Sequence, residues 1–531
     1  MCRPFQDSHR HDGRAMAAAD LKDVLVAISE KNGRGWARPR LPCAAPLLRR
    51  TTPGIDRGSL SSRFIPQHDA KGSSVARVAV IGGGISGLGT ALMLGRRGHT
   101  VTLFEQDTRQ AGEDLNGDFF HWDRPRIPQA IQPHSLLAPV RTVLRTEAPD
   151  VYADLLARGA REYHEFDWFG EHPPHRAGDE DLVTLRTRRI VLEAALTAAV
   201  RREPTVDMRR GCRVRALTFQ EGHPVQVTGV QVGAEIHQAD LVVDASGRRS
   251  PVPTWLIAAG CRPPVVDSHR TGIAYLCRWY RLRADGPRDP GRVKTGSAAP
   301  FALAGVFPSD NDTFAVNLVV STGDPTRGAL TDPSVFEAVA RRFPATAAWL
   351  DLTPEPQTAV LAMAGLDNRW TALTDDNGPV VTGLVNAGDS LIHTNPTLGQ
   401  GVALGLRAAQ YLASHVDQIA ADPIGYHTWT AQALRPWFDA QVTADRANEQ
   451  RLTESSPLSD RRAAALAACA FDDPVVMRAR AQVRHLLRQA HDAYGTDEVD
   501  RHLNAWLAAH PDFSPKHDGP TRDQWDVLIQ G

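Results

Sequence analysis

The stretch that decides the fold is VAVIGGGISGLGTALMLGRRGHTVTLFEQD, residues 78–107. It begins within the apolar run VARVAVI, which is typical of a β-strand buried on both faces. A glycine turn follows, then apolar residues at helical spacing, and then a second apolar segment, TVTLFE, over 100–105. This order predicts a strand, a turn, a helix and a second strand, which is the outline of a dinucleotide-binding unit.

The glycines of this stretch have the spacing G-x-G-x-x-G at Gly82, Gly84 and Gly87. The first glycine permits the tight turn, the second lets the backbone approach a diphosphate, and the third lets the helix pack closely on the strand. The free N–H groups at the start of the helix favour the phosphate charge. Glu105 ends the second strand, where a carboxylate accepts ribose hydroxyls and repels a 2′-phosphate. NAD and FAD therefore both remain candidates, and NADP is disfavoured.

A second turn of the same physical kind lies about three hundred residues later, in NAGDSLIHTNPTLGQGVALGLRAA, residues 386–409. Gly388 and Asp389 follow a predicted buried strand, and Gly399 and Gly401 lead into a predicted helix. An Asp at a strand end binds a polyol, and the start of a helix stabilises negative charge. Reduced flavin has a ribityl chain and an anionic ring, whereas NAD has neither. This second turn favours FAD.

Three motifs together resemble the p-hydroxybenzoate hydroxylase superfamily of FAD-dependent monooxygenases. They are the first glycine turn with Glu105, the segment DLVVDASGRRSP over 240–251, and the G-D motif with NPTLGQG. The resemblance covers residues 75 to about 415. It is greatest to the branch that holds epoxidase-like and geranylgeranyl-reductase-like enzymes.

The resemblance implies a role for individual residues. Asp389, after Gly388, would hold the ribityl chain, and the turn of Pro396, Gly399 and Gly401 would cover the isoalloxazine. Residues implied in further flavin contacts are Arg189, Arg141 as a weaker candidate, and Ala245 and Gly247 near the ADP half.

The sequence also departs from the superfamily pattern in two places. The middle motif is Asp244-Ala245-Ser246-Gly247 rather than an Asp-Gly pair, which puts direct NAD(P)H binding in doubt. His393 stands one place later than the superfamily histidine and is assigned no role.

The resemblance implies a reaction carried by the flavin itself. There is no second G-x-G-x-x-G and no C-x-x-C pair among the six cysteines, which disfavours a separate NADPH domain and a disulfide reductase. We expect reduced flavin to react with O2, to form a C4a-hydroperoxide and to pass one oxygen atom to a lipophilic small molecule, by hydroxylation or epoxidation. NAD(P)H would be the electron donor, directly or through a separate flavin reductase. No catalytic residue is assigned.

Three alternatives stay open. The first is a flavin-dependent reductase of isoprenoid double bonds, and the second is a flavin-dependent halogenase, although the few lysines have no matching context. The third is a flavoprotein without catalytic activity.

The predicted fold class is α/β, with a Rossmann-type FAD-binding domain (GR2-like), an antiparallel-sheet substrate domain with one face covered, and a helical C-terminal region. The predicted boundaries are 1–73 for a poorly ordered N-terminal extension, 75–265 and 376–415 for a discontinuous FAD-binding domain, 266–375 for the substrate-binding sheet, and 416–531 for the helical region. Four aromatic residues of the sheet, Tyr275, Trp279, Tyr280 and Trp370, are interpreted as core rather than as pocket walls.

Composition excludes several other classes of function. The chain has 531 residues and a net charge of −1, so nothing favours a nucleic acid partner. The cysteines and histidines show no metal-ligand spacing, so no metal is expected. No apolar run reaches the length of about 20 residues that spans a bilayer. We expect a cytoplasmic enzyme.

Overall fold

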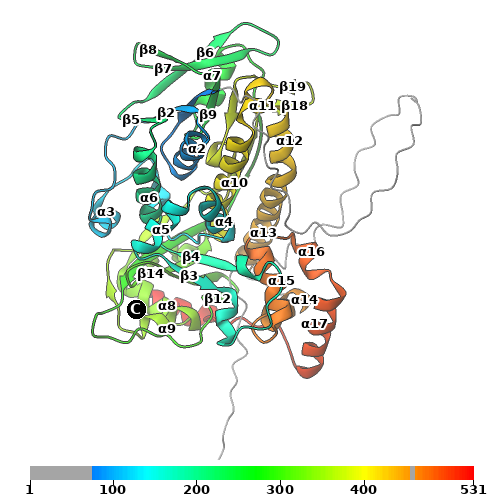
Figure 1. The fold of residues 1–531 in the computed structure, drawn as a ribbon. Helices are drawn as coiled ribbons and strands as arrows, with labels where there is room; N and C mark the ends of the chain where they lie inside the picture. Colours follow the sequence, from blue (N-terminus) through cyan, green and yellow to red (C-terminus); the bar gives the residue numbers. More distant parts are fainter. Residues whose placement is uncertain (1–74, 455–460, 531) are drawn as a thin grey trace, which may run out of the picture.

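The computed structural model describes residues 75–454 and 461–530, and Figure 1 shows their arrangement. The predicted N-terminal extension, residues 1–73, lies outside the described residues. No helix of the described segments is long and apolar enough to cross a membrane.

A five-stranded parallel sheet forms the centre of the cofactor half of the molecule. Its strand order is β20-β9-β1-β2-β5. The strands are β1 (Arg77–Ile81), β2 (Thr100–Glu105), β5 (Val206–Arg210), β9 (Leu241–Asp244) and β20 (Leu384–Asn386). β20 pairs with β9, so the chain returns to this sheet after an excursion of more than a hundred residues. The predicted α/β class with a Rossmann-type sheet is confirmed.

Alternate residues of β1 point into two different cores. Val78 and Val80 pack in the cluster that includes helices α2, α6 and α10, while Ala79 and Ile81 pack with the opposite layer. The helices are α2 (Ile85–Gly95), α6 (Arg189–Arg202) and α10 (Gly401–Ser414). The opposite layer consists of β6 (Val214–Gln220), β7 (Gln226–Val232), β8 (Glu235–Gln238) and α7 (Val252–Ala258). Burial on both faces explains why the strand is continuously apolar from Val78 to Ile81, after the exposed Arg77.

A second, antiparallel sheet lies beside the first, with strand order β12-β13-β14-β11-β15 and with β16 also paired to β11. Its strands are β11 (Ile273–Arg281), β12 (Gly296–Ala299), β13 (Ala302–Pro308), β14 (Thr313–Ser321), β15 (Glu355–Pro356) and β16 (Leu361–Met363). A smaller sheet joins β10 (Val265–Arg270), β17 (Asp367–Ala372) and β21 (Ile392–His393).

The expectation that only one face of the antiparallel sheet is covered is wrong. Helices α8 (Pro333–Ala340), α9 (Pro344–Leu350) and α18 (Arg522–Gln530) cover one face, and the other face contributes Cys277 and Trp279 to the core of the cofactor half. A charged residue at Arg278 suggests that this face of β11 meets solvent. Its guanidinium instead donates to Glu337 of α8 at 2.5 Å.

The linking segments and the C-terminal part are mainly helical. Before the antiparallel sheet lie α3 (Leu115–His121), α4 (Ala138–Glu147), α5 (Pro149–Ala157) and the ribbon of β3 (Arg161–His164) and β4 (Val183–Arg186), with the short 3-10 helix η3 (Glu165–Phe169) between its strands. After α10 come α11 (Val416–Ala421), α12 (Ile424–Ala433), α13 (Arg435–Glu454), α14 (Arg461–Cys469), α15 (Pro474–Arg484), α16 (Ala490–Tyr494) and α17 (Asp497–Ala509). The predicted helical C-terminal region is confirmed, and α14 to α17 share a small core of their own.

Candidate functional site

A cavity of about 780 Å³ runs along the carboxyl ends of the parallel strands. Every strand contributes a lining residue at or just after its end. They are Gly82 after β1, Glu105 of β2, Cys212 after β5, Ala245 after β9 and Asp389 after β20. Ligands of open α/β sheets bind at this edge, and the volume lies within the roughly 300–1,000 Å³ of small-molecule sites. We call this the long cavity.

The three glycines of the first turn have different surroundings. Gly82 has φ +104°, and a Cβ there would lie 2.5 Å from the carbonyl oxygen of Ala245. A Cβ on Gly87 would lie 1.9 Å from the carbonyl oxygen of Gly82, so this glycine serves packing and does not line the cavity. Gly84 lines the cavity, and a Cβ there would have Arg189 Nη2 at 4.0 Å as its nearest neighbour. The N–H groups of Gly82 and Gly83 donate to Phe104 and Glu105, so the N–H groups that stay open to a ligand are those at the uncapped start of α2.

Glu105 lies at the predicted place on the cavity wall. Its Oε2 accepts a hydrogen bond from the backbone N–H of Gly83 at 2.6 Å, and its Oε1 accepts from the N–H of Asp107 at 2.7 Å. These bonds fix the carboxylate, and each oxygen has a further lone pair for a hydroxyl donor.

The two predicted arginines lie in different places. Arg189 begins α6, lines the long cavity and donates from Nε to Glu193 at 2.7 Å. Burial alone would raise the pKa of Glu193, but Arg189 and Arg124 outweigh burial and hold this pKa below its usual value. Arg141 donates to Glu162 and to the carbonyl oxygen of Glu180, and it is absent from the described cavity wall.

The G-D turn brings Asp389 to the cavity. Gly388 has φ +61°, and a Cβ there would lie 2.4 Å from Ser86 Oγ of α2, so the turn requires glycine. Burial would raise the pKa of Asp389, but His393, Arg189 and His134 lower it further than burial raises it. The carboxylate is therefore kept charged and available to accept hydroxyl donors.

His393 lies at the site, although no role was assigned to it from its place in the motif. Its Nδ1 lies 3.3 Å from Asp389 Oδ2, and it lines the long cavity. The spacing of four residues from Asp389 was the only available signal. His393 Nε2, Thr394 Oγ1 and Gln400 Oε1 are buried side-chain atoms of this wall with no hydrogen-bond partner among the described residues. Buried polar atoms are normally paired, so this wall suits a ligand rich in donors and acceptors, such as a flavin.

The turn before α10 places the N-terminus of that helix at the wall of the same cavity. Pro396, Gly399 and Gly401 all line it, and Gly399 adopts a left-handed conformation with φ +66°. Neither α10 nor α2 has a side-chain cap at its start. Both helices therefore offer unpaired N–H groups and the positive end of the helix dipole to the cavity.

Helix α13 supports this turn from behind. The carboxylate of Asp445 accepts hydrogen bonds from Asn368 at 2.7 Å, Asn395 at 3.0 Å, Thr397 at 3.2 Å and Gln441 at 3.0 Å. Burial raises the pKa of Asp445 to about 6. One element of the C-terminal region thus positions the residues on either side of Pro396.

The middle motif closes the cavity near the first turn. Ala245 and Gly247 both line it, and Gly247 has φ +90°. Their contact with the ADP half of FAD stays a prediction. The carboxylate of Asp244 accepts from the N–H of Ser246 at 3.0 Å and from Ser250 Oγ at 2.5 Å, which holds the turn.

A smaller pocket adjoins the long cavity, and His134, Ser135 and Phe307 line both. His134 Nδ1 lies 2.8 Å from the carbonyl oxygen of Gln132. Burial, and then the charge of Arg189, lower the pKa of His134 to about 4, so this imidazole is neutral at physiological pH. No motif in the surrounding sequence indicated this residue.

The four aromatic residues of the sheet lie in the core, as interpreted. Trp279 packs edge-on against Phe119 with ring centroids 5.0 Å apart, and Tyr280 stacks on Phe314 at 5.4 Å. Tyr275 donates to Asn395 at 3.0 Å, and Trp370 is buried. Within residues 75–454 and 461–530 there is no group of three or more His, Cys, Asp or Glu that could hold a metal ion.

Comparison with known proteins agrees with this geometry. The family described as FAD dependent oxidoreductase (DAO) matches residues 77–178. The protein Rv3254 of Mycobacterium tuberculosis is 26% identical over 375 residues, which cover 64% of this chain and 73% of that protein.

Three solved structures share the fold at low sequence identity. PqsL of Pseudomonas aeruginosa, described as a probable FAD-dependent monooxygenase, has a TM-score of 0.52 and 19% identity, covering 72% of this chain and 99% of PqsL. The p-nitrophenol 4-monooxygenase PnpA of Pseudomonas putida has a TM-score of 0.51 and 17% identity, covering 78% and 98% of the two chains. The flavin-dependent brominase Bmp2 has a TM-score of 0.54 and 14% identity, covering 82% and 100%. The chain is an oxidoreductase with an FAD-binding domain, built on the fold of flavin monooxygenases.

Proposed function

We propose that this chain is an FAD-dependent monooxygenase of the p-hydroxybenzoate hydroxylase superfamily, in its epoxidase-like and geranylgeranyl-reductase-like branch. It would insert one oxygen atom from O2 into a lipophilic small molecule, by hydroxylation or epoxidation. The observation that carries this proposal is one cavity lined by both Glu105 and Asp389, next to a second pocket that shares Phe307 with it. A dinucleotide site alone would not need the second pocket.

Each part of the long cavity suits one part of FAD. The backbone of the first glycine turn and the start of α2 would hold the diphosphate, with Arg189 beside it. Glu105 would accept the ribose hydroxyls, and Asp389 the ribityl hydroxyls. The turn from Pro396 to Gly401 would lie against the tricyclic ring, where the start of α10 favours negative charge. When bound, FAD would supply electron storage and the activation of O2.

The protein's own contribution is to hold the substrate, exclude water and keep the surrounding groups in fixed protonation states. His134 is neutral and lies where the two cavities meet, so it accepts or donates a hydrogen bond without adding charge. Phe307 supplies an apolar wall at the same junction. No general acid or base is assigned.

The electron donor is proposed to be NAD(P)H, acting directly or through a separate flavin reductase. The absence of an Asp-Gly pair at Asp244-Ala245 favours the indirect route. Anaerobic mixing of the FAD-loaded protein with NADH or NADPH tests the direct route. Bleaching of the flavin by dithionite but not by either nucleotide would indicate a partner reductase.

Incubation under isotopically labelled O2, with a reductant and a library of lipophilic compounds, tests the oxygenase activity itself. We expect a product that carries one labelled oxygen atom. A product that has gained two hydrogens and no label would instead establish the reductase of isoprenoid double bonds.

Halogenation is the second candidate function, because Lys294 lines the smaller pocket. A flavin-dependent halogenase would need bromide or chloride for turnover and would lose activity in Lys294→Met. Halide-independent oxygen incorporation would exclude it.

A further inference from the structure

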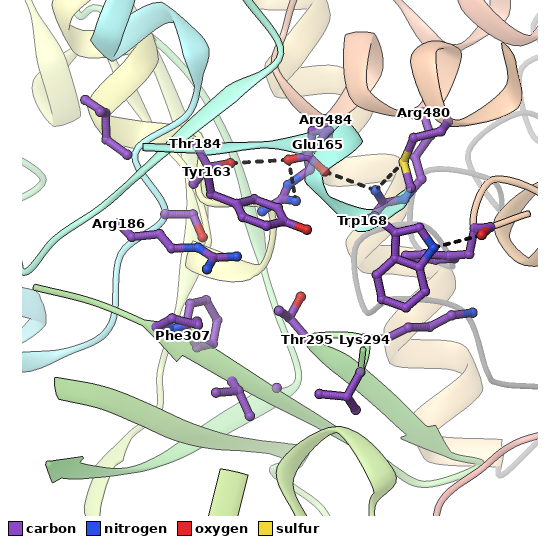
Figure 2. Close-up of a pocket in the computed structure, with 18 of the residues that line it drawn as sticks. Tyr163, Glu165, Trp168, Thr184, Arg186, Lys294, Thr295, Phe307, Arg480 and Arg484 are labelled. Carbon is purple, nitrogen blue, oxygen red and sulfur yellow. Dashed lines mark hydrogen bonds and ion pairs between the residues drawn. The ribbon is translucent and has the colours of Figure 1, made fainter. Parts of the chain in front are cut away.

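The smaller pocket is built by segments from across the chain (Figure 2). It has a volume of about 70 Å³ and lies between the β3–β4 ribbon, strand β13 and helix α15. Tyr163 and Trp168 come from the ribbon and η3, Phe307 comes from β13, and Met477 and Arg480 come from α15. We call this the cationic pocket, after the arginines and the lysine that line it.

Its lining residues carry an excess of positive charge. The cations are Arg186, Lys294, Arg480 and Arg484, and the only carboxylate among the lining residues is Glu165. Lys294 and Arg480 have further interactions beyond this lining, so the cation that decides the matter is Arg186. A charge that is removed from bulk water is rarely left unbalanced, so a cation without a partner in a pocket indicates an anionic ligand.

The one carboxylate is already engaged by other residues. Glu165 Oε1 lies 2.8 Å from Arg484 Nη1 and 3.1 Å from His485 Nε2, and Glu165 Oε2 lies 3.4 Å from Arg480 Nη1. Burial would raise the pKa of Glu165, but these neighbours hold it well below its usual value. Glu165 therefore forms its ion pairs with residues of α15 and the residue after it, and its charge reaches Arg186 only at longer range.

Arg186 is the cation of that opposite wall. Among the residues that the structure describes, its guanidinium forms no salt bridge and no hydrogen bond, and it lies 3.7 Å from the ring centroid of Tyr163. In Figure 2 its side chain extends toward the interior of the pocket beside Tyr163 and Phe307. Stacking on a ring leaves the edge of the guanidinium free, and this edge is the part that binds a carboxylate through two parallel hydrogen bonds.

The remaining walls and the size of the pocket define the rest of the ligand. Trp168, Val306 and Phe307 are apolar or aromatic, and Phe307 continues into the long cavity. A volume of about 70 Å³ corresponds to roughly two water molecules, so it admits an anionic head group but not a whole substrate. The apolar body would extend past His134 toward the cofactor site.

We propose that the cationic pocket binds the carboxylate of an otherwise lipophilic substrate, with Arg186 as its anchor. That this ligand is the substrate rests on the proposed function. That the pocket binds a lipophilic carboxylate does not. The site thereby narrows the substrate class from lipophilic molecules to lipophilic organic acids.

Calorimetric titration of the full-length protein with matched probes tests this proposal. The probes are cinnamate and octanoate, each compared with its own primary amide, and FAD content is measured in every sample. We expect each acid to bind the wild type about 10-fold or more tightly than its amide, since a charge-assisted pair is lost in the amide. Arg186→Gln should bring the two affinities within about 2-fold, and Arg186→Lys should keep an intermediate preference because it retains the charge but not the fork.

Arg161→Gln is the matched control, because Arg161 is the cross-strand partner of Arg186 in the ribbon and its side chain is 66% exposed. This variant should keep the full preference for acids, and thermal unfolding should show that all variants are folded. Acids that bind no better than amides, acids that do not bind, or a preference that survives Arg186→Gln would overturn the proposal. A preserved preference in a protein that binds no FAD would overturn the proposed function and support the acid site.

Discussion

The long cavity and the cationic pocket meet at His134, Ser135 and Phe307, yet they are constructed differently. The long cavity is shaped by backbone, because its turns need glycine at Gly82 and Gly388 and because the uncapped starts of α2 and α10 face it. The cationic pocket is shaped by long side chains from segments that lie up to 350 residues apart, from His134 to Arg484. We therefore expect the first site to tolerate few changes of its turn residues, whereas the second should change its ligand by a few side-chain substitutions.

Of the changes considered, the removal of Glu165 should lower the free energy of unfolding most. Such a loss would confirm that Glu165 compensates the positive charge of the arginines around it. In Glu165→Ala, Arg484, Arg480 and His485 lose their buried partner, which typically costs about 3–5 kcal/mol. Urea unfolding curves measure this cost, and Glu171→Ala, at an exposed acid, is the control. A loss below about 1 kcal/mol would mean that the arginines reach solvent when Glu165 is absent.

Gly87→Ala should affect the long cavity through packing alone. The new Cβ would lie 1.9 Å from a backbone oxygen, which cannot move aside, so we expect a loss of about 1–3 kcal/mol together with weaker FAD binding. Gly425→Ala is the control because a Cβ there meets nothing within 4 Å. A variant that unfolds like the wild type and binds FAD equally well would show that the turn is not rigid.

Asp445 holds the turn at Pro396, and we expect it to make the free energy of unfolding depend on pH. Its pKa is raised to about 6 in the fold, above about 3.9 in the unfolded chain, so the stabilisation is present below pH 4 and is lost as pH rises through 6. Relative to Asp445→Asn, the wild type should lose on the order of 2–3 kcal/mol between pH 4 and pH 7. Unfolding curves at several pH values measure the difference. Asp439→Asn, at an exposed acid of the same helix that pairs with Arg435, is the control for exchanging a carboxylate for an amide on α13.

The smallest effect that we expect is on the affinity for FAD, and it should differ between Arg189 and Arg141. Arg189→Gln should weaken FAD binding about 10-fold, because a charge at the cavity wall is lost. Arg141→Gln should leave the affinity for FAD unchanged, because Arg141 pairs with Glu162 away from the cavity. Titration of FAD fluorescence measures both. An equal loss in the two variants would contradict the placement of Arg141.

The contrast between the long cavity and the cationic pocket also explains which residues could be placed from the sequence. Glu105 and Asp389 could be placed together because the carboxyl ends of parallel strands share one edge, whatever their separation in the chain. Arg186 and Glu165 could not, because no local pattern records which distant side chains meet. The covering of the second sheet face was missed for a related reason: Arg278 looks solvent-exposed in its strand, and its partner Glu337 lies on a helix nearly sixty residues later.

The most direct test of the central claim is the stoichiometry of FAD binding to the purified full-length protein, measured by absorbance after removal of free flavin. We predict one FAD per chain, and a clear loss of bound FAD in Glu105→Ala and in Asp389→Ala, which change opposite ends of the long cavity. Retention of FAD in only one of these variants would mean that the two ends do not hold one cofactor. A wild-type protein that binds no FAD would contradict the account.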